Sequence, residues 1–436
     1  MGYLDENWPD FGLSDSAAMV SVMKLYVFNE SELVGVLAKD QDDIYSFQYA
    51  TDWLSHPNGF DLSFQLPRQT TPFGHRQTQA FFENLLPEGP VRQILAQHRV
   101  QGVIQTLTRY GKDCAGAIVV TPNPVPPSHT HDQQEVLFSR SDIEQAIGQG
   151  TIVDALVERN PGYLSIAGAQ DKFPAIVRGE KVFLPLSGQP TTHIIKPPIA
   201  RFKESVYNEY FCMRLADAVG LPVPHVQVLQ GTIPLFVIER FDRHHIDGRV
   251  RRLHQQDFCQ ALGLSSLQKY ESQGGPSFAD CVHLIKQHVQ VRHRAKDLFT
   301  LIDWLCFNLL IGNNDSHAKN ISLLSDQGEY RLTPFYDLLC TVIYPTLQRD
   351  FAFQVGGRFD VLSLSVRNVE AFEQGVGIKS GTLLIRLQLM WNRMNTTLSA
   401  VVTTVEEELP DCKIAARITR QIHKRAKGFR TIGLQV

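Results

Sequence analysis

The chain has 436 residues, of which 43% are hydrophobic and 20% charged, and its formal net charge is −3. This length exceeds the roughly 100–200 residues of a typical domain, so we expect at least two lobes, each with its own core. The small net charge excludes a surface that is basic as a whole. Any contact with nucleic acid must therefore come from a local basic patch. No apolar run reaches the ~18 residues of a membrane span, and we expect no membrane partner.

The first part of the chain alternates predicted strands and helices. We expect strands at 23–28, 32–39, 43–50 and 116–122, and helices at 75–87 and 91–100. The Pro-rich stretch 122–134 predicts a loop. A helix over 139–150 follows, with Ser141 as its N-cap and Glu144 at capping-box spacing.

The second part changes from mixed to mostly helical structure. Strands are predicted for FPAIVR, KVFLPL, THIIKPP (192–198), HVQVLQG and IPLFVIERFDR (233–243), with a helix at 206–221 that ends at Gly220. From about residue 251 the pattern is mainly helical. Seven cysteines are scattered along the chain without a CxxC pair. This pattern indicates small core residues rather than disulfides, and a protein of the reducing cytoplasm.

The segment IGNNDSHAKN (311–320) carries the chemistry. Asp315 stands five residues before Asn320, and YRLTPFYD then places Asp337 at the end of a predicted short strand. Phosphoryl transfer needs a carboxylate beside the acceptor hydroxyl and hard oxygen ligands for Mg²⁺. The order of these three residues is that of protein kinases. His317 and Lys319 share the loop and are candidate ATP contacts, and Lys319 is placed to steady a transferring phosphate.

Residues upstream complete a kinase pattern. Lys196 lies in the apolar strand HIIKPP, where a lysine would pair with ATP phosphates, and Glu209 on the next helix would orient it. The backbone of Glu239 and the ring of Phe241 stand where a hinge would hold adenine. Taken singly, each residue also has an ordinary interpretation: Asp315 as a helix cap, Lys196 as a surface residue, and Glu209 as a solvated one.

A loop of small residues, LSIAGAQDK (164–172), precedes Lys196. Its bare backbone is suited to donate N–H groups to phosphate oxygens, so we expect it to cover the nucleotide. It contains one glycine and is therefore not a GxGxxG motif. The residues that would make these contacts are Ile166, Ala167, Gly168 and Ala169.

Together, LSIAGAQDK, TTHIIKPP, NEYFCMRLADAVGL, IERFDR, KYESQGGP, GNNDSHAKN and LTPFYD resemble the HipA family of serine/threonine-kinase toxins. The resemblance runs from about residue 23 to the C-terminus. It implies a two-lobed, protein-kinase-like α+β fold with a mixed α/β N-terminal lobe and a mainly helical C-terminal lobe. We therefore expect an N-terminal subdomain (23–135), a nucleotide-binding part (136–247) and a catalytic lobe (248–436), preceded by an acidic tail (1–22) that lies outside the resemblance.

The resemblance also implies use of ATP and Mg²⁺. It makes Asp315 the catalytic residue, Asn320 and Asp337 the metal ligands, and Ser165 an autophosphorylated serine whose modification inactivates the kinase. A phosphoserine carries about −1.5 to −2 charges and would compete with ATP phosphates for the same donors. The ordinary alternative is that Ser165 is an inert turn residue.

The resemblance further implies a HipB-like antitoxin as partner, with operator DNA bound mainly through that complex, and glutamyl-tRNA synthetase as a candidate substrate. The basic segment 413–430 places Arg417, Arg420, Lys424 and Lys427 on one helical face, which is either a DNA contact or simply a solvated face. The run 286–296 is a second basic candidate. Two other functions stay open: a small-molecule phosphotransferase, and a catalytically silent protein that binds antitoxin and DNA.

Overall fold

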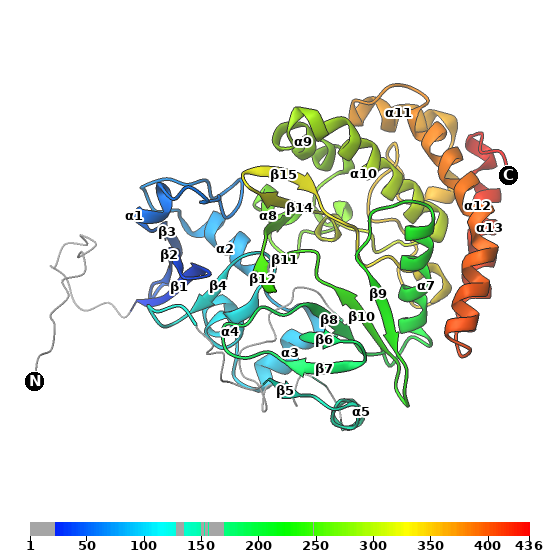
Figure 1. Ribbon diagram of the computed structural model, residues 1–436. Helices are drawn as coiled ribbons and strands as arrows, with labels where there is room; N and C mark the ends of the chain where they lie inside the picture. The colour runs from blue at the N-terminus through cyan, green and yellow to red at the C-terminus, as the bar shows by residue number, and fades with distance from the viewer. Residues whose placement is uncertain (1–21, 128–134, 150–151, 153–155, 157–169, 247) are drawn as a thin grey trace, which may run out of the picture.

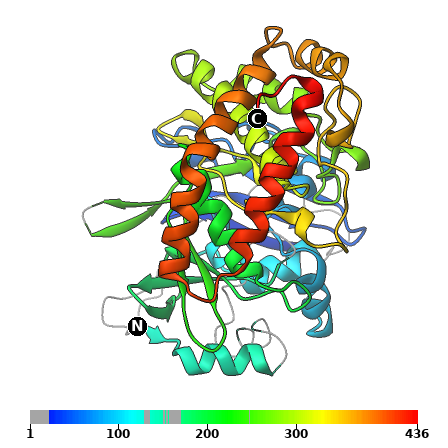
Figure 2. The same cartoon turned by 90° about the vertical axis from the view of Figure 1, so that its right-hand side faces the viewer.

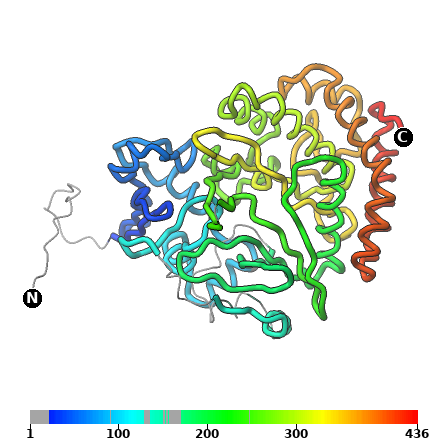
Figure 3. The backbone as a smooth tube through the Cα atoms, in the orientation of Figure 1, coloured from blue at the N-terminus to red at the C-terminus, as the bar shows by residue number. Residues whose placement is uncertain are grey.

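The computed structural model describes residues 22–127, 135–149, 152, 156, 170–246 and 248–436. In these ranges the N-terminal part lies at one end of the molecule and the C-terminal helices lie at the other (Figure 1). The backbone trace passes between them through a central antiparallel sheet (Figure 3). The fold is therefore a two-lobed α+β arrangement with a mainly helical C-terminal side, as the sequence predicted.

A four-stranded antiparallel sheet in the order β3-β2-β1-β4 forms the N-terminal part. Its strands are β1 (Met23–Asn29), β2 (Glu32–Lys39), β3 (Tyr45–Tyr49) and β4 (Val119–Thr121). The alternation predicted for β3 is observed, because Tyr45, Phe47 and Tyr49 are buried while the residues between them are half-buried. The helices here are α1 (Thr51–Leu54), α2 (His75–Glu83), α3 (Gly89–Gln97) and α4 (Gly102–Tyr110), followed by the short η1 (Gly111–Asp113).

The central sheet has six strands in the order β5-β7-β6-β8-β10-β9, and every pair in it is antiparallel. The strands are β5 (Val136–Leu137), β6 (Phe173–Arg178), β7 (Lys181–Leu184), β8 (His193–Lys196), β9 (Val226–Leu229) and β10 (Leu235–Glu239). Helices α5 (Arg140–Gly148) and α7 (Ser205–Ala218) belong to the same part. The register pairs Lys196 with Phe236, which places the lysine at the end of β8.

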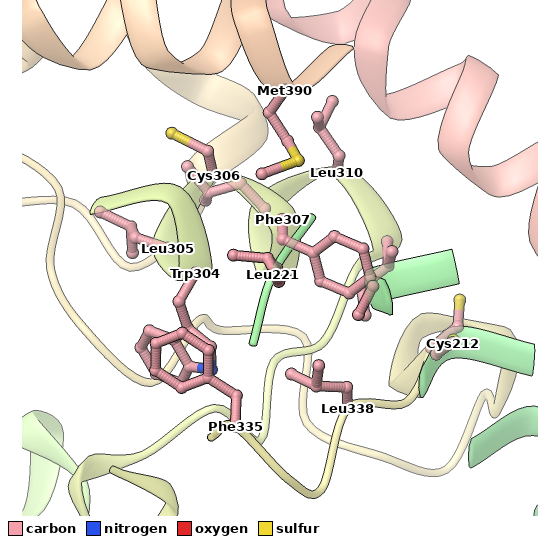
Figure 4. Packing of buried hydrophobic residues seen from close by; sticks show 14 of the residues in the cluster. Cys212, Leu221, Trp304, Leu305, Cys306, Phe307, Leu310, Phe335, Leu338 and Met390 are labelled. Atoms are coloured by element: carbon pink, nitrogen blue, oxygen red, sulfur yellow. The ribbon is translucent and has the colours of Figure 1, made fainter. Parts of the chain in front are cut away.

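The C-terminal lobe is built mainly on helices. They are α8 (Phe258–Leu262), α9 (Phe278–His288), α10 (Val291–Ile311), α11 (Val366–Val376), α12 (Thr382–Glu408) and α13 (Ile414–Gly428). The 3-10 turns are η2 (Glu271–Gln273), η3 (Ala318–Asn320), η4 (Thr341–Ile343), η5 (Val361–Ser363) and η6 (Phe429–Ile432). The second half of α10 is buried on all sides, and Trp304 stacks on Phe335 with ring centroids 5.7 Å apart (Figure 4).

Helices α12 and α13 run side by side along one face of this lobe (Figure 2). The isoleucines of α13 at 414, 418 and 422 are buried, and Arg417, Arg420, Lys424 and Lys427 are exposed. The separation of an apolar stripe from a basic face is therefore confirmed. Within the described residues, no helix is both long enough and apolar enough to span a bilayer.

Three local predictions were wrong. The N-cap of α5 is Ser139, whose hydroxyl accepts from the Asp142 backbone N–H, so Ser141 lies inside the first turn. Glu144 does not complete a capping box, because its carboxylate accepts from Arg140 at 2.8 Å. The helix predicted to reach residue 87 ends at Glu83, where the C-cap residue Asn84 donates from Nδ2 both to the Ala80 carbonyl in the last turn and to the Leu264 carbonyl outside the helix.

The region after residue 251 is mainly helical, as its pattern predicted, but it also holds strands that were not predicted. After the hairpin of β11 (Arg243–Ile246) and β12 (Arg249–Arg252), a three-stranded sheet forms from β13 (His254–Asp257), β14 (Ser322–Asp326) and β15 (Glu329–Leu332). The polar sequence HQQD of β13 has no strand periodicity of its own, and pairing with β14 holds it extended. Asp337 is not at a strand end, because β15 stops five residues before it.

Candidate active site

The loop that follows α10 holds Asp315 in a fixed position. Helix α10 ends at Gly312, whose φ of 73° is in the left-handed region that favours glycine. The Asn313 side chain donates to the Asp337 carbonyl at 3.1 Å and accepts from the Asp315 backbone N–H at 3.2 Å. Asn320 donates through Nδ2 to the Asp315 carbonyl at 3.1 Å. Asp315 is nevertheless exposed between buried neighbours, so its carboxylate faces outward from a rigid loop.

Lys196 lies between two carboxylates. Its Nζ donates to Glu209 on α7 at 2.7 Å and also to Asp337. The lysine and Glu209 side chains are 5% and 4% exposed, whereas Asp337 is 30% exposed. The predicted Lys196–Glu209 pair is therefore present, and Asp337 is the member of the trio that opens to solvent. Asp337 has a φ of 54°, a left-handed conformation that Asp tolerates better than most residues.

Charge in this trio is fixed by its surroundings. Burial acts to lower the pKa of Lys196, but the charges of Asp337 and Glu209 outweigh burial and raise that pKa above its usual value. Burial acts to raise the pKa of Asp337, and Lys196 with Lys172 brings it below the usual range. Burial and the Asp337 charge raise the pKa of Glu209 in spite of Lys196. The ammonium and the Asp337 carboxylate are thus both charged at neutral pH.

A cavity of about 710 Å³ joins these groups to the hinge. All eight candidate residues that the structure describes line it: Lys196, Glu239, Phe241, Asp315, His317, Lys319, Asn320 and Asp337. The candidate site therefore comes together in space from segments more than 100 residues apart. Ser165, Ile166, Ala167, Gly168 and Ala169 lie outside the described residues, so the covering loop stays a prediction.

The hinge end of the cavity contains an aromatic pair. The rings of Phe241 and Tyr336 stack with centroids 5.6 Å apart and planes inclined by 23°. The Glu239 backbone N–H donates to the His225 carbonyl at 2.9 Å within the sheet. This N–H is therefore already hydrogen bonded, so a contact between Glu239 and adenine would use the Glu239 carbonyl or its side chain.

Lys319 and His317 are buried rather than solvated. Lys319 donates to Oδ1 of Asn84 at 2.6 Å and lies 3.3 Å from both Glu88 and Asp257. Burial lowers the pKa of His317 to about 4, so its ring is neutral at pH 7. Its Nδ1 is buried and, among the described residues, has no hydrogen-bond partner, as expected of an atom that a polar ligand would reach.

Sequence reasoning missed three residues at this site. Glu88 pairs with both Lys319 and Lys269, and Tyr270 donates a hydrogen bond to Oδ1 of Asp315. Lys172 borders the cavity, and burial lowers its pKa to about 8 although Asp337 opposes that effect. The signals available were weak: single polar residues within the motifs FFENLLPEGPVR, KYESQGGP and LSIAGAQDK.

The donor set fits a nucleotide with Mg²⁺. Because Asn320 uses Nδ2 to hold Asp315, its Oδ1 is turned away from that bond. An amide oxygen and a carboxylate are hard ligands that Mg²⁺ prefers, with phosphate oxygens and water completing the octahedron. Asn320 and Asp337 would hold the metal, and the Lys196 ammonium would meet phosphate at the same cavity wall.

Comparison with known protein families gives two matches in this chain. Residues 25–121 match the HipA N-terminal domain, and residues 164–409 match the HipA-like C-terminal domain. The "Putative kinase Y4mE" of Sinorhizobium fredii is 37% identical over 398 residues, which cover 89% of this chain and 93% of the relative. The "Serine/threonine-protein kinase toxin HipA" of Shewanella oneidensis is 29% identical over 388 residues, covering 85% and 87%.

A solved structure extends the likeness to the whole fold. HipA in the Shewanella oneidensis complex of HipA, HipB and operator DNA superposes with a TM-score of 0.80 at 26% sequence identity. The match covers 94% of this chain and 100% of that one. The arrangement of lobes described above is therefore also that of an experimentally determined protein.

Proposed function

This chain belongs to the HipA family, and we propose that it is an ATP- and Mg²⁺-dependent protein serine/threonine kinase that acts as the toxin of a toxin–antitoxin module. The observation that carries the proposal is the Lys196 ammonium held between Glu209 and Asp337, in the same cavity as the exposed Asp315. The names of two similar proteins, a putative kinase and a serine/threonine-kinase toxin, support it.

The proposed reaction moves the γ-phosphoryl group to a protein hydroxyl. The bond between the γ-phosphorus and the bridging oxygen breaks, a bond to the acceptor oxygen forms, and ADP leaves. Asp315 orients the acceptor hydroxyl and takes its proton. Bound Mg²⁺ supplies positive charge to the phosphate oxygens, and Asn320 with Asp337 would hold it.

Lys196 has two roles in this proposal. Its ammonium is charged, and it stands where α- and β-phosphate oxygens would contact it. Glu209, which is almost fully buried, holds the ammonium at the end of β8. Phe241, whose ring stacks on that of Tyr336, would cover one face of the adenine. The neutral ring of His317 and the ammonium of Lys319 would contact the nucleotide from the catalytic loop.

The test is phosphate incorporation into purified protein, freed of phosphate beforehand. After incubation with ATP, with and without Mg²⁺, intact-mass and peptide mass spectrometry locate any phosphate. We expect Mg²⁺-dependent incorporation, absent in Asp315→Asn, because the amide cannot accept the hydroxyl proton. Phosphate transfer that persists in Asp315→Asn would remove Asp315 from the mechanism.

We propose Ser165 as the autophosphorylated residue and as an inactivating switch. The support is the resemblance of LSIAGAQDK to the family loop, together with the charge that a phosphoserine would add to a loop predicted to cover the nucleotide phosphates. Nucleotide affinity should fall after stoichiometric phosphorylation of Ser165, and Ser165→Ala should keep its affinity after the same incubation. Undiminished affinity of the phosphorylated protein would contradict the switch.

The partners follow from the same family assignment. We propose a HipB-like antitoxin and, through that complex, operator DNA in the cytoplasm, since the similar Shewanella oneidensis protein was solved with both. The exposed basic face of α13 is the first candidate for a direct DNA contact. Glutamyl-tRNA synthetase is the first protein to test as substrate. Co-purification with the antitoxin and a mobility shift with and without it would test assembly.

A further inference from the structure

The Asp315 carboxylate has a neighbour for which the proposed mechanism has so far given no role. The phenol of Tyr270, which comes just before η2, donates its O–H to Oδ1 of Asp315. Among the described residues, Tyr270 is the one side chain that donates a hydrogen bond to this carboxylate. The two residues are 45 positions apart, so the contact is created by the fold rather than by the loop sequence.

Tyr270 is itself fixed from several sides. Its ring meets the ring of His317 edge to face, with centroids 5.0 Å apart and planes at 90°. The carbonyl of Lys269 accepts from the Ala318 backbone N–H at 3.3 Å, and the Tyr270 carbonyl accepts from the Gly275 N–H at 2.9 Å. The phenol therefore reaches Asp315 from a segment that is bonded directly to the catalytic loop.

A charged residue of the N-terminal part strengthens this connection. Glu88 lies 2.7 Å from Lys269 and 3.3 Å from Lys319, which flank Tyr270 and Asp315 in their own segments. Glu271, on the other side of Tyr270, accepts from the Gln354 N–H at 2.7 Å. Both neighbours of Tyr270 are thus bound, which limits the movement available to the phenol.

We propose that Tyr270 is a positioning residue for phosphoryl transfer, which holds one oxygen of Asp315 so that the other faces the acceptor hydroxyl. The proposal rests on the proposed function, because it gives Asp315 the role of base. Without a hydrogen-bond donor, the Asp315 carboxylate can rotate about its side-chain torsions and exchange the positions of its two oxygens. A donor on Oδ1 removes that freedom. Misplacement of a reacting group by about 1 Å costs on the order of 100-fold in rate, so orientation of this kind matters.

The test compares Tyr270→Phe with wild type in the initial rate of phosphate incorporation from Mg·ATP, measured over a range of ATP concentrations. We expect kcat to fall about tenfold, while the apparent KM for ATP and the melting temperature stay at the wild-type values. Tyr330→Phe is the matched control, because Tyr330 is also a half-buried tyrosine and does not line the cavity. It should behave as wild type.

Three results would overturn the proposal. A kcat for Tyr270→Phe within twofold of wild type would show that the hydrogen bond does not orient Asp315. A raised kcat would make the phenol a group that blocks the acceptor site. A parallel loss of ATP affinity and melting temperature would make it merely structural. Transfer that persists in Asp315→Asn, or is absent from wild type, would instead contradict the proposed function beneath it.

Discussion

Two buried charge clusters contribute residues to the cavity wall, and they differ in whether solvent reaches a member of each. The enclosed cluster consists of Asp113, Arg240, Asp242, Arg243 and Arg252, whose side chains are at most 6% exposed. The open cluster consists of Lys196, Glu209 and Asp337, of which Asp337 is 30% exposed and faces the cavity.

The hydrogen bonds of the enclosed cluster end within the protein. Asp113 accepts from Arg243 at 2.8 Å and from Arg240 at 3.0 Å, and Asp242 accepts from Arg240 and from the Gly116 N–H. These contacts attach the segment after α4 to the hinge. The open cluster leaves Asp337 accessible. Arg240 and Asp242 also line the cavity, so neither burial of charge nor a place in the cavity wall separates the two clusters; the solvent-exposed carboxylate of Asp337 does.

The largest effect is expected from breaking the enclosed cluster. Asp113→Asn removes the charge that faces three buried guanidinium groups, so the unfolding free energy should fall by about 3–5 kcal/mol. Urea denaturation followed by circular dichroism measures it. Asp326→Asn, an exposed carboxylate, is the control. A loss below about 1 kcal/mol for Asp113→Asn would show that the cluster does not hold the two segments together.

Breaking the open cluster should separate activity from stability. Asp337→Asn removes a partly exposed charge and leaves Lys196 paired with Glu209, so the melting temperature should stay close to that of wild type. Phosphate transfer should fall about 100-fold or more, because a proposed ligand of the Mg²⁺ that neutralises the reacting phosphates is lost. Transfer rates and melting curves measured on one preparation of each protein test this prediction. A lower melting temperature with unchanged phosphate transfer would mean that the open cluster serves stability rather than activity.

A smaller effect is expected from a histidine beside the enclosed cluster. His254 is buried, hydrogen bonded to the Leu62 carbonyl, and burial lowers its pKa to about 4. The unfolded chain, with a histidine pKa near 6.5, takes up the proton first on acidification. Stability from His254 is therefore complete above about pH 6.5 and is lost as the pH falls toward 4, by about 2 kcal/mol at pH 5.

His254→Gln, which keeps a side-chain donor, should flatten the dependence of unfolding free energy on pH between 6.5 and 4. His193 and His317, whose pKa values burial also lowers to about 4, should leave a residual slope. Denaturation series at pH 7, 6 and 5 measure the difference. An unchanged slope in His254→Gln would mean that this histidine titrates alike in the folded and unfolded chains.

The smallest effect is expected at an exposed pair. Nη2 of Arg292 donates to both carboxylate oxygens of Glu329, and the two side chains are 65% and 38% exposed. Water screens both charges, so Glu329→Gln should leave melting temperature and phosphate transfer unchanged. A clear drop in melting temperature would show that exposure is a poor guide to the value of charge pairs in this molecule.

The charged residues that the sequence motifs place in the cavity were more predictable than the rest of the molecule. Lys196, Asp315 and Asp337 stand in motifs whose order follows from the chemistry, and the structure brings them to one cavity. Glu88 and Tyr270 were not predicted, because the contact of Glu88 with Lys319 spans more than 200 residues and that of Tyr270 with Asp315 spans 45. Ser139 replaced Ser141 as a cap because either serine suits the pattern and only backbone geometry distinguishes them.

In our proposal, the open cluster is arranged to bind a nucleotide together with Mg²⁺. The decisive experiment is a calorimetric titration of ATP into wild type and Lys196→Met, each with and without Mg²⁺. We predict binding to wild type that Mg²⁺ strengthens, and at least about tenfold weaker binding to Lys196→Met, since a charge-assisted contact with phosphate is lost. Equal affinity of the two proteins for Mg·ATP would contradict the account.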